Sequence, residues 1–265
     1  MRLALGVEYD GTAFMGWQRQ SHPGRTVQAC LEAAVTRVAD HPIEVTCAGR
    51  TDAGVHATGQ VVHFDTQAQR PLYGWLLGLN SNLPADIAVR WVQPVSDEFH
   101  ARFRARAREY RYTILNRLTR PALARLQVTW LHHSLNVTPM QEAAQALVGE
   151  HDFSAFRAAE CQARSPVRTL YRLEVTRSGE YVVIEAVANG FLQHMVRNIA
   201  GVLIAVGTGR QASAWVPAVL AGRERARAGV TAPAQGLCFV AVSYALAFGI
   251  PVPADADFAG VPASE

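Results

Sequence analysis

The sequence predicts an α+β protein made of two similar halves, and three observations support this. Strand-like and helix-like segments follow the order βαββαβ over residues 1–105, and a similar order recurs over residues 106–248. The 265 residues are also enough for two modest domains. We therefore expect two ferredoxin-like (RRM-like) halves side by side, with a central antiparallel sheet and an active-site cleft between them.

The first half begins with an apolar strand at residues 2–9, which ends at the Asp10-Gly11 turn. Thr26 is the expected N-cap of a helix, because Val27, Leu31, Val35 and Val38 follow it at the spacing of one helical face. Further strands are expected at residues 43–47, where apolar residues alternate, at 59–66 and at 86–95, and a second helix at 73–83.

The second half begins with a strand at residues 108–115. A helix is expected at 138–149, with Thr138 as its cap, Pro139 at its first position and Gly149 as its stop. A hairpin at 169–189 should turn at Ser178-Gly179. Helices at about 191–206 and at 215–222 and a strand at 236–246 complete the half, and residues 249–265 form a loosely ordered tail.

The composition is that of an ordinary folded protein, with 49% hydrophobic and 18% charged residues. The first residues lack the pattern of a signal peptide, and no apolar stretch approaches the length of roughly 18 residues that suggests a membrane span. The four cysteines are scattered without paired spacing, which argues against a zinc site or a disulfide framework. We expect a reduced, cytoplasmic protein with no membrane association.

All 25 basic residues are arginines, and several of them alternate in one stretch. If residues 99–114 are extended, their period of two places Arg102, Arg104, Arg106, Arg108 and Tyr110 on one face. Such a row suits contacts with RNA phosphates beside a stacked base. On the row alone, a solvated face of an edge strand, which arginine protects from aggregation, is slightly favoured.

Asp52 lies in a loop with Arg50 and with Gly49, Gly54 and Gly59, which strip bulk from around its carboxylate. The acid is either a turn residue or a reactive group open to a substrate. The glycines are expected to serve backbone geometry and close approach.

The sequence lacks the residues that several other kinds of catalytic site require. Glycosidases usually need two carboxylates, but Asp10 lies on a separate turn, where an Asp-Gly pair is ordinarily turn-forming. A phosphate loop ending in lysine is excluded because the chain has no lysine, and the histidines, including His56, His63, His132 and His133, show no metal-binding spacing. A lone carboxylate with arginines and an aromatic residue suits a nucleophile that needs neither metal nor cofactor.

The stretch AGRTDAGVHATGQVVHF at residues 48–64 resembles the signature of the tRNA pseudouridine synthase A family. Gln193, Cys238 and Ala245 depart from the usual family pattern at positions outside the expected catalytic set. Six further blocks resemble the family in its order: EYDGTAFMGWQRQ (8–20), NSNLPADIAV (80–89), REYRYTI (108–114), HDFSAFRAAECQARSPVRTL (151–170), FLQHMVRNIAGVLIAVGTGR (191–210) and TAPAQGLCFVAVSY (231–244).

The resemblance implies isomerisation of uridine to pseudouridine at positions 38, 39 and 40, in the anticodon arm of tRNA. It implies Asp52 as the catalytic residue, with attack at C1′, addition at C6 and base catalysis at C2′ all open. It also implies a homodimer with tRNA lying across both subunits, and no cofactor.

The resemblance also assigns roles to other residues. Arg197 pairs with the catalytic aspartate, and Tyr110 stacks on the target base, with Tyr112 as its rival on the same strand face. Arg50 helps to extrude the nucleotide, and Leu237 packs under the base. Arg104, Arg106 and Arg108 are candidate RNA contacts.

Two other functional classes stay open. A non-catalytic RNA-binding module would use the same arginines, but it would lack the combination of Asp52, Arg197 and Tyr110. A nucleoside hydrolase or glycosidase would break the same bond, but it would need a second carboxylate and would release the free base.

Overall fold

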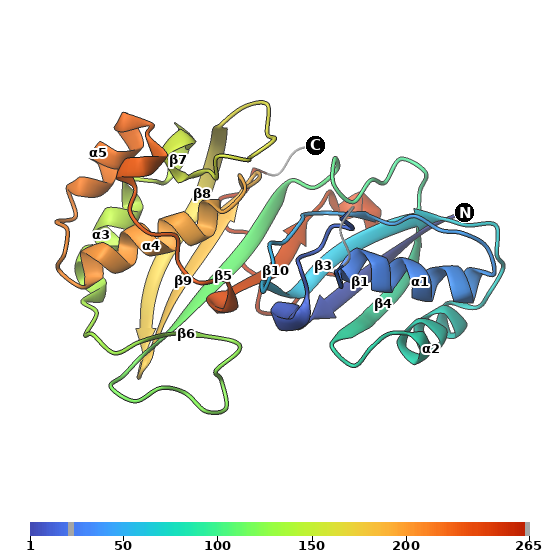
Figure 1. Ribbon diagram of the computed structural model, residues 1–265. Helices are drawn as coiled ribbons and strands as arrows, with labels where there is room; N and C mark the ends of the chain where they lie inside the picture. Colours follow the sequence, from blue (N-terminus) through green and yellow to red (C-terminus); the bar gives the residue numbers. More distant parts are fainter. Residues whose placement is uncertain (21–23, 263–265) are drawn as a thin grey trace. The chain divides into compact units, whose positions relative to one another are not determined.

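The computed structural model describes residues 1–20 and 24–262, and Figure 1 labels its helices and strands. The chain forms two compact units that both contain strands and helices, which confirms the predicted α+β class. Unit 1 comprises Met1–Arg106 and Phe239–Ala256, and unit 2 comprises Ala107–Cys238 and the described residues from Asp257 on.

Unit 1 is built on a sheet with the strand order β4-β1-β3-β10, and the short β2 also pairs with β3. β1 is antiparallel to both β3 and β4. Helices α1 and α2 contact each other and lie on one face of this sheet (Figure 1). The elements are β1 (Arg2–Tyr9), η1 (Gly11–Ala13), α1 (Val27–Ala39), β2 (Thr46–Cys47), β3 (His56–Asp65), α2 (Leu72–Asn82), β4 (Ile87–Val95), β10 (Leu237–Ser243) and η5 (Leu246–Phe248).

Helix α1 forms where the sequence predicts it. The Thr26 hydroxyl accepts a hydrogen bond from the backbone N of Ala29 at 3.4 Å, which satisfies one of the free donors at the helix start. The predicted apolar face is buried: Val27, Leu31, Val35 and Val38.

The strands of unit 2 follow the order β5-β9-β8-β7, in which neighbouring strands are antiparallel, and β6 adds to β5 in parallel. The predicted hairpin is confirmed, because β8 ends at Ser178 and Gly179 turns the chain with a φ of 58°. The elements are β5 (Ala107–Asn116), β6 (Thr129–Leu131), α3 (Val137–Gln145), β7 (Gly149–Asp152), η2 (Ser154–Phe156), β8 (Val167–Ser178), β9 (Tyr181–Ala188), α4 (Met195–Gly207), α5 (Trp215–Gly222), η3 (Arg225–Arg227) and η4 (Ala234–Gly236).

The strand predicted at residues 43–47 is only two residues long, Thr46–Cys47. Side chains of α1 take the backbone donors that a longer strand would use. The N–H of Ile43 donates to the Thr36 hydroxyl at 3.1 Å, and the N–H of Val45 donates to Glu32 Oε1 at 3.2 Å. These bonds replace strand pairing with attachment to the helix.

Two predicted helix starts were also wrong. Asn136, not Thr138, caps α3, and its side chain accepts from the N–H of Thr138 at 3.2 Å. Helix α4 starts at Met195 rather than near Phe191, because His194 has a left-handed φ of 62° that cannot continue a helix.

The last part of the chain is divided differently from the predicted second half at 106–248 and the predicted tail from residue 249 on. Phe239–Ala256 belong to unit 1, so most of β10 belongs to unit 1 rather than to unit 2. The segment expected to be loose makes defined contacts: Gln93 Nε2 donates to the carbonyl of Gly249 at 3.2 Å. The N–H of Asp257 donates to Glu109 Oε2 at 3.0 Å, which attaches the following residues to unit 2.

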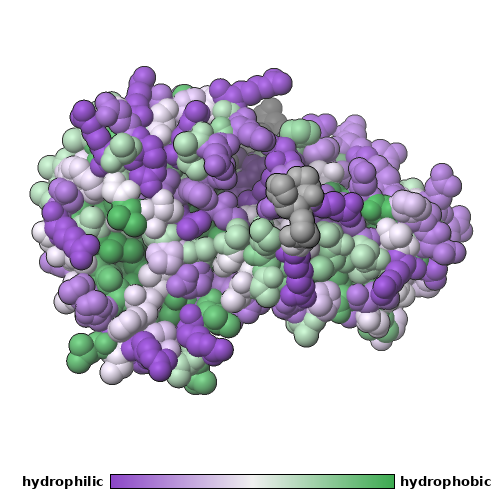
Figure 2. Space-filling view, viewed as in Figure 1, coloured by the Kyte–Doolittle hydropathy of each residue, from purple (hydrophilic) through white to green (hydrophobic). Residues whose placement is uncertain are grey.

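Large apolar side chains are exposed around β6 and in the loop before it. Those exposed here are Leu118, Leu123, Leu126 and Trp130. At the lower left of Figure 2, hydrophobic residues reach the surface among hydrophilic ones.

Candidate active site

The loop that carries Asp52 is held on both sides by hydrogen bonds within unit 1. The hydroxyls of Thr51 and Tyr9 lie 2.8 Å apart in a buried hydrogen bond, and the carbonyl of Thr51 accepts from the N–H of Trp17 at 3.0 Å. The N–H of Val55 donates to the carbonyl of Asp52 at 3.2 Å, which closes a turn. Asp52 is therefore a half-buried carboxylate on a fixed backbone.

The glycines around Asp52 have the predicted backbone roles. Gly54 has a φ of 76°, which disfavours any side chain. A Cβ at Gly49 would lie 2.9 Å from the ring of Phe239, and one at Gly59 would lie 2.0 Å from the carbonyl oxygen of Val240. Both positions require a close approach that only glycine permits.

Arg50 is exposed on the same loop, two residues before Asp52. No carboxylate lies within 4.0 Å of its guanidinium among the residues that the structure describes. Burial raises the pKa of the neighbouring Cys47 thiol to about 12, although the charges of Arg50 and Arg102 oppose this rise. Cys47 is thus a protonated core residue at neutral pH.

In unit 2, Tyr110 and Tyr112 project from one face of β5, and both are buried. The Tyr112 hydroxyl bonds to the Thr129 hydroxyl at 2.5 Å and donates to the carbonyl of Pro233 at 2.9 Å. Burial also raises the pKa of Tyr112. Tyr110 instead contacts the ring of Phe191, edge to face, at 5.0 Å. The hydroxyl of Tyr112 is committed to structural bonds, which disfavours it as the reactive tyrosine.

Arg197 lies in the first turn of α4 and is tied to the segment that leads into β10. Its Nε donates to the carbonyl of Ala232 at 2.9 Å, and its own carbonyl accepts from the N–H of Ala232 at 3.1 Å. The next carbonyl, that of Pro233, accepts from Tyr112, and Leu237 is buried four residues later. One short segment of unit 2 therefore positions Arg197 and Leu237 relative to β5.

Asn198, next to Arg197 on α4, is a buried polar residue that the sequence did not single out. Its side chain is fully buried, and its Nδ2 donates to the carbonyl of Phe156 at 2.7 Å. Its Oδ1 accepts from Arg225 Nη2 at 3.0 Å and from the Thr231 hydroxyl at 2.6 Å. The sequence does carry a sign of this burial, because an amide side chain stands within the apolar stripe of α4, directly after Arg197.

The arginine row does not form one face, which corrects that prediction. Residues 101–104 form a turn, and β5 begins only at Ala107. Nδ1 of His100 accepts from the N–H groups of Arg102 and Phe103, each at 3.2 Å, and the N–H of Arg104 donates to the carbonyl of His100 at 3.0 Å. These local bonds compete successfully with an extended backbone.

The candidate RNA contacts therefore have different surroundings. Arg104 is exposed, and its Nε donates to the carbonyl of Glu98 at 3.2 Å. Arg106 is half-buried just before β5, whereas Arg108 lies within the strand and its Nη1 donates to the carbonyl of Asn189 at 2.8 Å.

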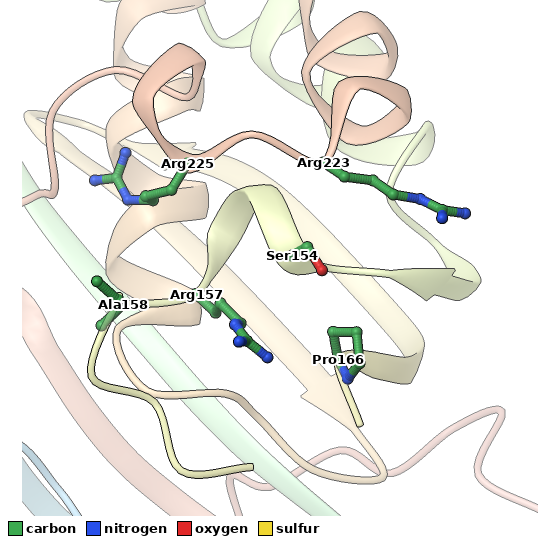
Figure 3. Close-up of a pocket in the computed structure, with 7 residues that line it drawn as sticks. Ser154, Arg157, Ala158, Pro166, Arg223 and Arg225 are labelled. Atoms are coloured by element: carbon green, nitrogen blue, oxygen red, sulfur yellow. The ribbon is translucent and has the colours of Figure 1, made fainter. Parts of the chain in front are cut away.

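A cationic pocket of about 460 Å³ lies in unit 2 (Figure 3). Asp152 forms an ion pair with Arg223 at 3.3 Å and balances part of the positive charge. A hydrogen bond from Ser154 lowers the pKa of this carboxyl, with help from Arg223 and Arg157. Figure 3 shows that the side chains of Arg223 and Arg225 extend in opposite directions. The pocket is lined by Ser154, Arg157, Ala158, Ala159, Pro166, Arg223 and Arg225.

The other candidate side chains have structural partners. Asp10 Oδ1 accepts from the N–H of Thr12 at 2.9 Å, so Asp10 is the turn residue that the sequence predicts. Nδ1 of His56 accepts from the N–H of Gly11, and Nδ1 of His63 from that of Ala101, both at 3.1 Å. Within the described ranges, no three His, Cys, Asp or Glu side chains form a group suited to a metal ion. Each helix in residues 1–20 and 24–262 is too short or too polar to cross a membrane.

Comparison with known proteins identifies one family, and the relatives align with nearly the whole chain. The family described as tRNA pseudouridine synthase matches residues 6–104 and 143–245. A protein of Alcanivorax borkumensis named tRNA pseudouridine synthase A is 56% identical over 250 residues, covering 94% of each chain. Proteins of the same name from Nitrosococcus oceani and Methylococcus capsulatus are 57% and 56% identical, covering 95% and 99% of this chain and 96% of each relative. The chain belongs to the tRNA pseudouridine synthase A family, whose members are isomerases.

Proposed function

We propose that the protein isomerises uridine to pseudouridine in the anticodon arm of tRNA, at positions 38, 39 and 40. The similarity to enzymes named tRNA pseudouridine synthase A along almost the full chain supports the substrate class. The observation that carries the catalytic assignment is the half-buried carboxylate of Asp52 on a loop held by Thr51 and Gly49.

The reaction breaks the N1–C1′ bond of uridine, turns the uracil and joins its C5 to C1′. A proton leaves C5 and N1 gains one, so atoms and electrons balance within one nucleotide. We infer that Asp52 is the nucleophile that initiates the reaction. Attack at C1′ and addition at C6 both suit an ionised carboxylate, and proton removal from C2′ is the alternative in which Asp52 acts as a base. The chemistry requires neither redox cofactor nor metal.

The supporting residues are assigned on their resemblance to the family. Arg197 pairs with the Asp52 carboxylate. Tyr110 stacks on the target base and assists the proton transfer at C5, while Leu237 packs under the base. The firm attachment of Arg197 to Ala232 supports a positioned role rather than that of a mobile surface arginine.

Binding must also expose the target base, since a base inside a stack cannot be reached. Arg50 is the residue we assign to this extrusion, and its exposure beside Asp52 supports the assignment. Arg104, Arg106 and Arg108 contact phosphates of the anticodon arm. These contacts position the RNA without taking part in the chemical step.

On the same resemblance we propose that the protein is a homodimer. We also propose that it acts on tRNA in the cytoplasm. We also propose that each unit is a ferredoxin-like half. The order β1-α1-β2-β3-α2-β4 and the adjacency β4-β1-β3-β2 support this for unit 1. Sedimentation of the purified protein tests the dimer.

The deciding experiment incubates purified protein with unmodified tRNA and analyses the nucleosides by mass spectrometry after pseudouridine-specific labelling. We expect pseudouridine at positions 38, 39 or 40 with no free uracil. Release of uracil would indicate a hydrolase, and binding without either product would indicate a non-catalytic RNA-binding module.

A further inference from the structure

A row of aromatic rings runs from the core of unit 1 to its surface. Phe99 is fully buried, and its ring centroid lies 5.3 Å from that of Phe248 and 6.0 Å from that of His63. His63 lies 4.8 Å from His100, which lies 4.3 Å from Phe103. The ring of Phe103 ends the row and is 74% exposed.

The backbone beneath Phe103 is held by hydrogen bonds, so its exposure does not result from a loose loop. Nδ1 of His100 accepts from the N–H of Phe103 at 3.2 Å, and the carbonyl of His100 accepts from the N–H of Arg104 at 3.0 Å. Burial lowers the pKa of His100, which keeps this nitrogen available as an acceptor at neutral pH. The outer ring is therefore presented to solvent on a preorganised turn.

Positive charge flanks the exposed ring. The Arg102 guanidinium carbon lies over the Phe103 ring, 5.6 Å from its centroid, and the exposed Arg104 follows. An exposed ring with one guanidinium over it and a second arginine next in the chain suits a ligand with a planar face and a negative charge. Nucleotides of unpaired RNA have both features, and proteins bind them through base stacking combined with arginine contacts.

The aromatic row and the loop that carries Asp52 are both connected to β2. His63 on β3 pairs with Thr46 on β2, and the chain continues from β2 through Arg50 to Asp52. Arg50 and Arg102 both act electrostatically on the thiol of Cys47, the last residue of β2. Arg102 of the turn that presents Phe103 and Arg50 of the Asp52 loop thus both lie within electrostatic range of Cys47 in unit 1.

We infer that Phe103 is a stacking platform for an unpaired base of the RNA substrate, next to the uridine that reacts, with Arg102 and Arg104 beside the adjoining phosphates. This inference rests on the proposed RNA substrate, and it assigns Phe103 to binding and positioning rather than to the chemical step.

The test measures binding of a fluorescently labelled RNA with the sequence of a tRNA anticodon arm, by anisotropy over a range of salt concentrations. Phe103→Leu keeps apolar bulk but removes the π face, and should weaken binding about 5- to 150-fold, the range for removal of one base stack. Its salt slope should equal that of the unaltered protein, because the arginines that face the phosphates are all retained. Phe103→Trp, which restores a stacking surface, should bind at least as tightly as the unaltered protein.

Tyr73→Leu is the matched control, since Tyr73 is another exposed aromatic side chain of unit 1, on α2. It should change affinity by less than about twofold, as for an ordinary surface substitution. Single-turnover rates at saturating RNA should be unchanged in Phe103→Leu, which separates positioning from chemistry. All variants alter exposed side chains, and circular dichroism checks their folding.

The platform is overturned if Phe103→Leu binds the RNA within about twofold of the unaltered protein, or no more weakly than Tyr73→Leu. Either result leaves the proposed function standing if the unaltered protein forms pseudouridine. Conversely, absence of pseudouridine in the unaltered protein contradicts the proposed function, while the affinity comparison still decides whether Phe103 stacks on RNA.

Discussion

Gln60 and Gly49 are joined by two hydrogen bonds in unit 1. Gln60 is fully buried, its Nε2 donates to the carbonyl of Gly49 at 2.6 Å, and its Oε1 accepts from the N–H of Gly49 at 3.3 Å. A single side chain thereby anchors the backbone three residues before Asp52.

Gln60→Leu should loosen this loop and slow pseudouridine formation. Two backbone groups would be left without their partners, so the free energy of unfolding should fall by about 1–3 kcal/mol. Urea unfolding and single-turnover kinetics measure the two effects. Gln141→Leu is the control, because Gln141 Oε1 accepts from the N–H of Val175 at 2.7 Å in unit 2. It should lose stability but keep its rate, and equal rates in both variants would contradict the positioning role of Gln60.

Asp52→Asn should abolish turnover, since it removes the charge of the proposed nucleophile while keeping its shape. tRNA affinity should persist within a few-fold, measured by filter binding. Asp10→Asn provides the comparison: an asparagine can still accept from the N–H of Thr12, so both turn and activity should survive. Appreciable turnover by a clean Asp52→Asn preparation would remove Asp52 from the mechanism.

Tyr110→Phe and Tyr112→Phe should affect different properties, the rate of the chemical step and the stability of the fold. Tyr110→Phe keeps the ring and should bind tRNA normally, but it should slow the chemical step if its hydroxyl assists the proton transfer. Tyr112→Phe removes the bonds to Thr129 and Pro233, so it should destabilise the protein by about 1–3 kcal/mol without slowing that step. A normal single-turnover rate for Tyr110→Phe would limit Tyr110 to stacking.

Arg104→Gln combined with Arg106→Gln should weaken tRNA binding most at low salt. Removing one arginine–phosphate interaction should lower the log–log salt slope by about 0.7 to 0.9. Arg37→Gln with Arg70→Gln removes the same charge from other positions of unit 1 and should leave the slope nearly unaltered. An unaltered slope in the first double variant would show that these arginines do not contact the tRNA phosphates.

His63 should make the protein less stable in mild acid. Burial lowers the pKa of His63 to about 4, assisted by the charges of His100 and Arg2, whereas the ordinary value is 6.5. Between these values the unfolded chain binds a proton that the folded chain excludes, so the free energy of unfolding should fall as the pH drops from about 6.5 to 4. The full effect is about 3 kcal/mol.

His63→Asn tests this assignment, since its Oδ1 can accept from the N–H of Ala101 without titrating. Denaturation measured at several pH values should show a flatter dependence in this variant. An unchanged dependence would assign the acid sensitivity to other groups.

The sequence by itself determined the elements whose signals are local. The Thr26 cap, the apolar face of α1 and the hairpin turning at Gly179 depend on residues a few positions apart, and all three are confirmed. The resemblance to the family could also be found for the Asp52 loop from sequence alone, because the residues of its motif are contiguous. The glycine spacing correctly indicated close backbone approach, although the contacting partners of Gly49 and Gly59 lie near residue 240.

Only the tertiary structure decided which polar groups became each other's partners. Glu32 and Thr36 shorten β2, and Tyr112 finds Pro233 across 121 residues of sequence. Periodicity reports whether a side chain faces a core, but hydrogen-bond partners depend on which distant segments the fold brings within about 3 Å.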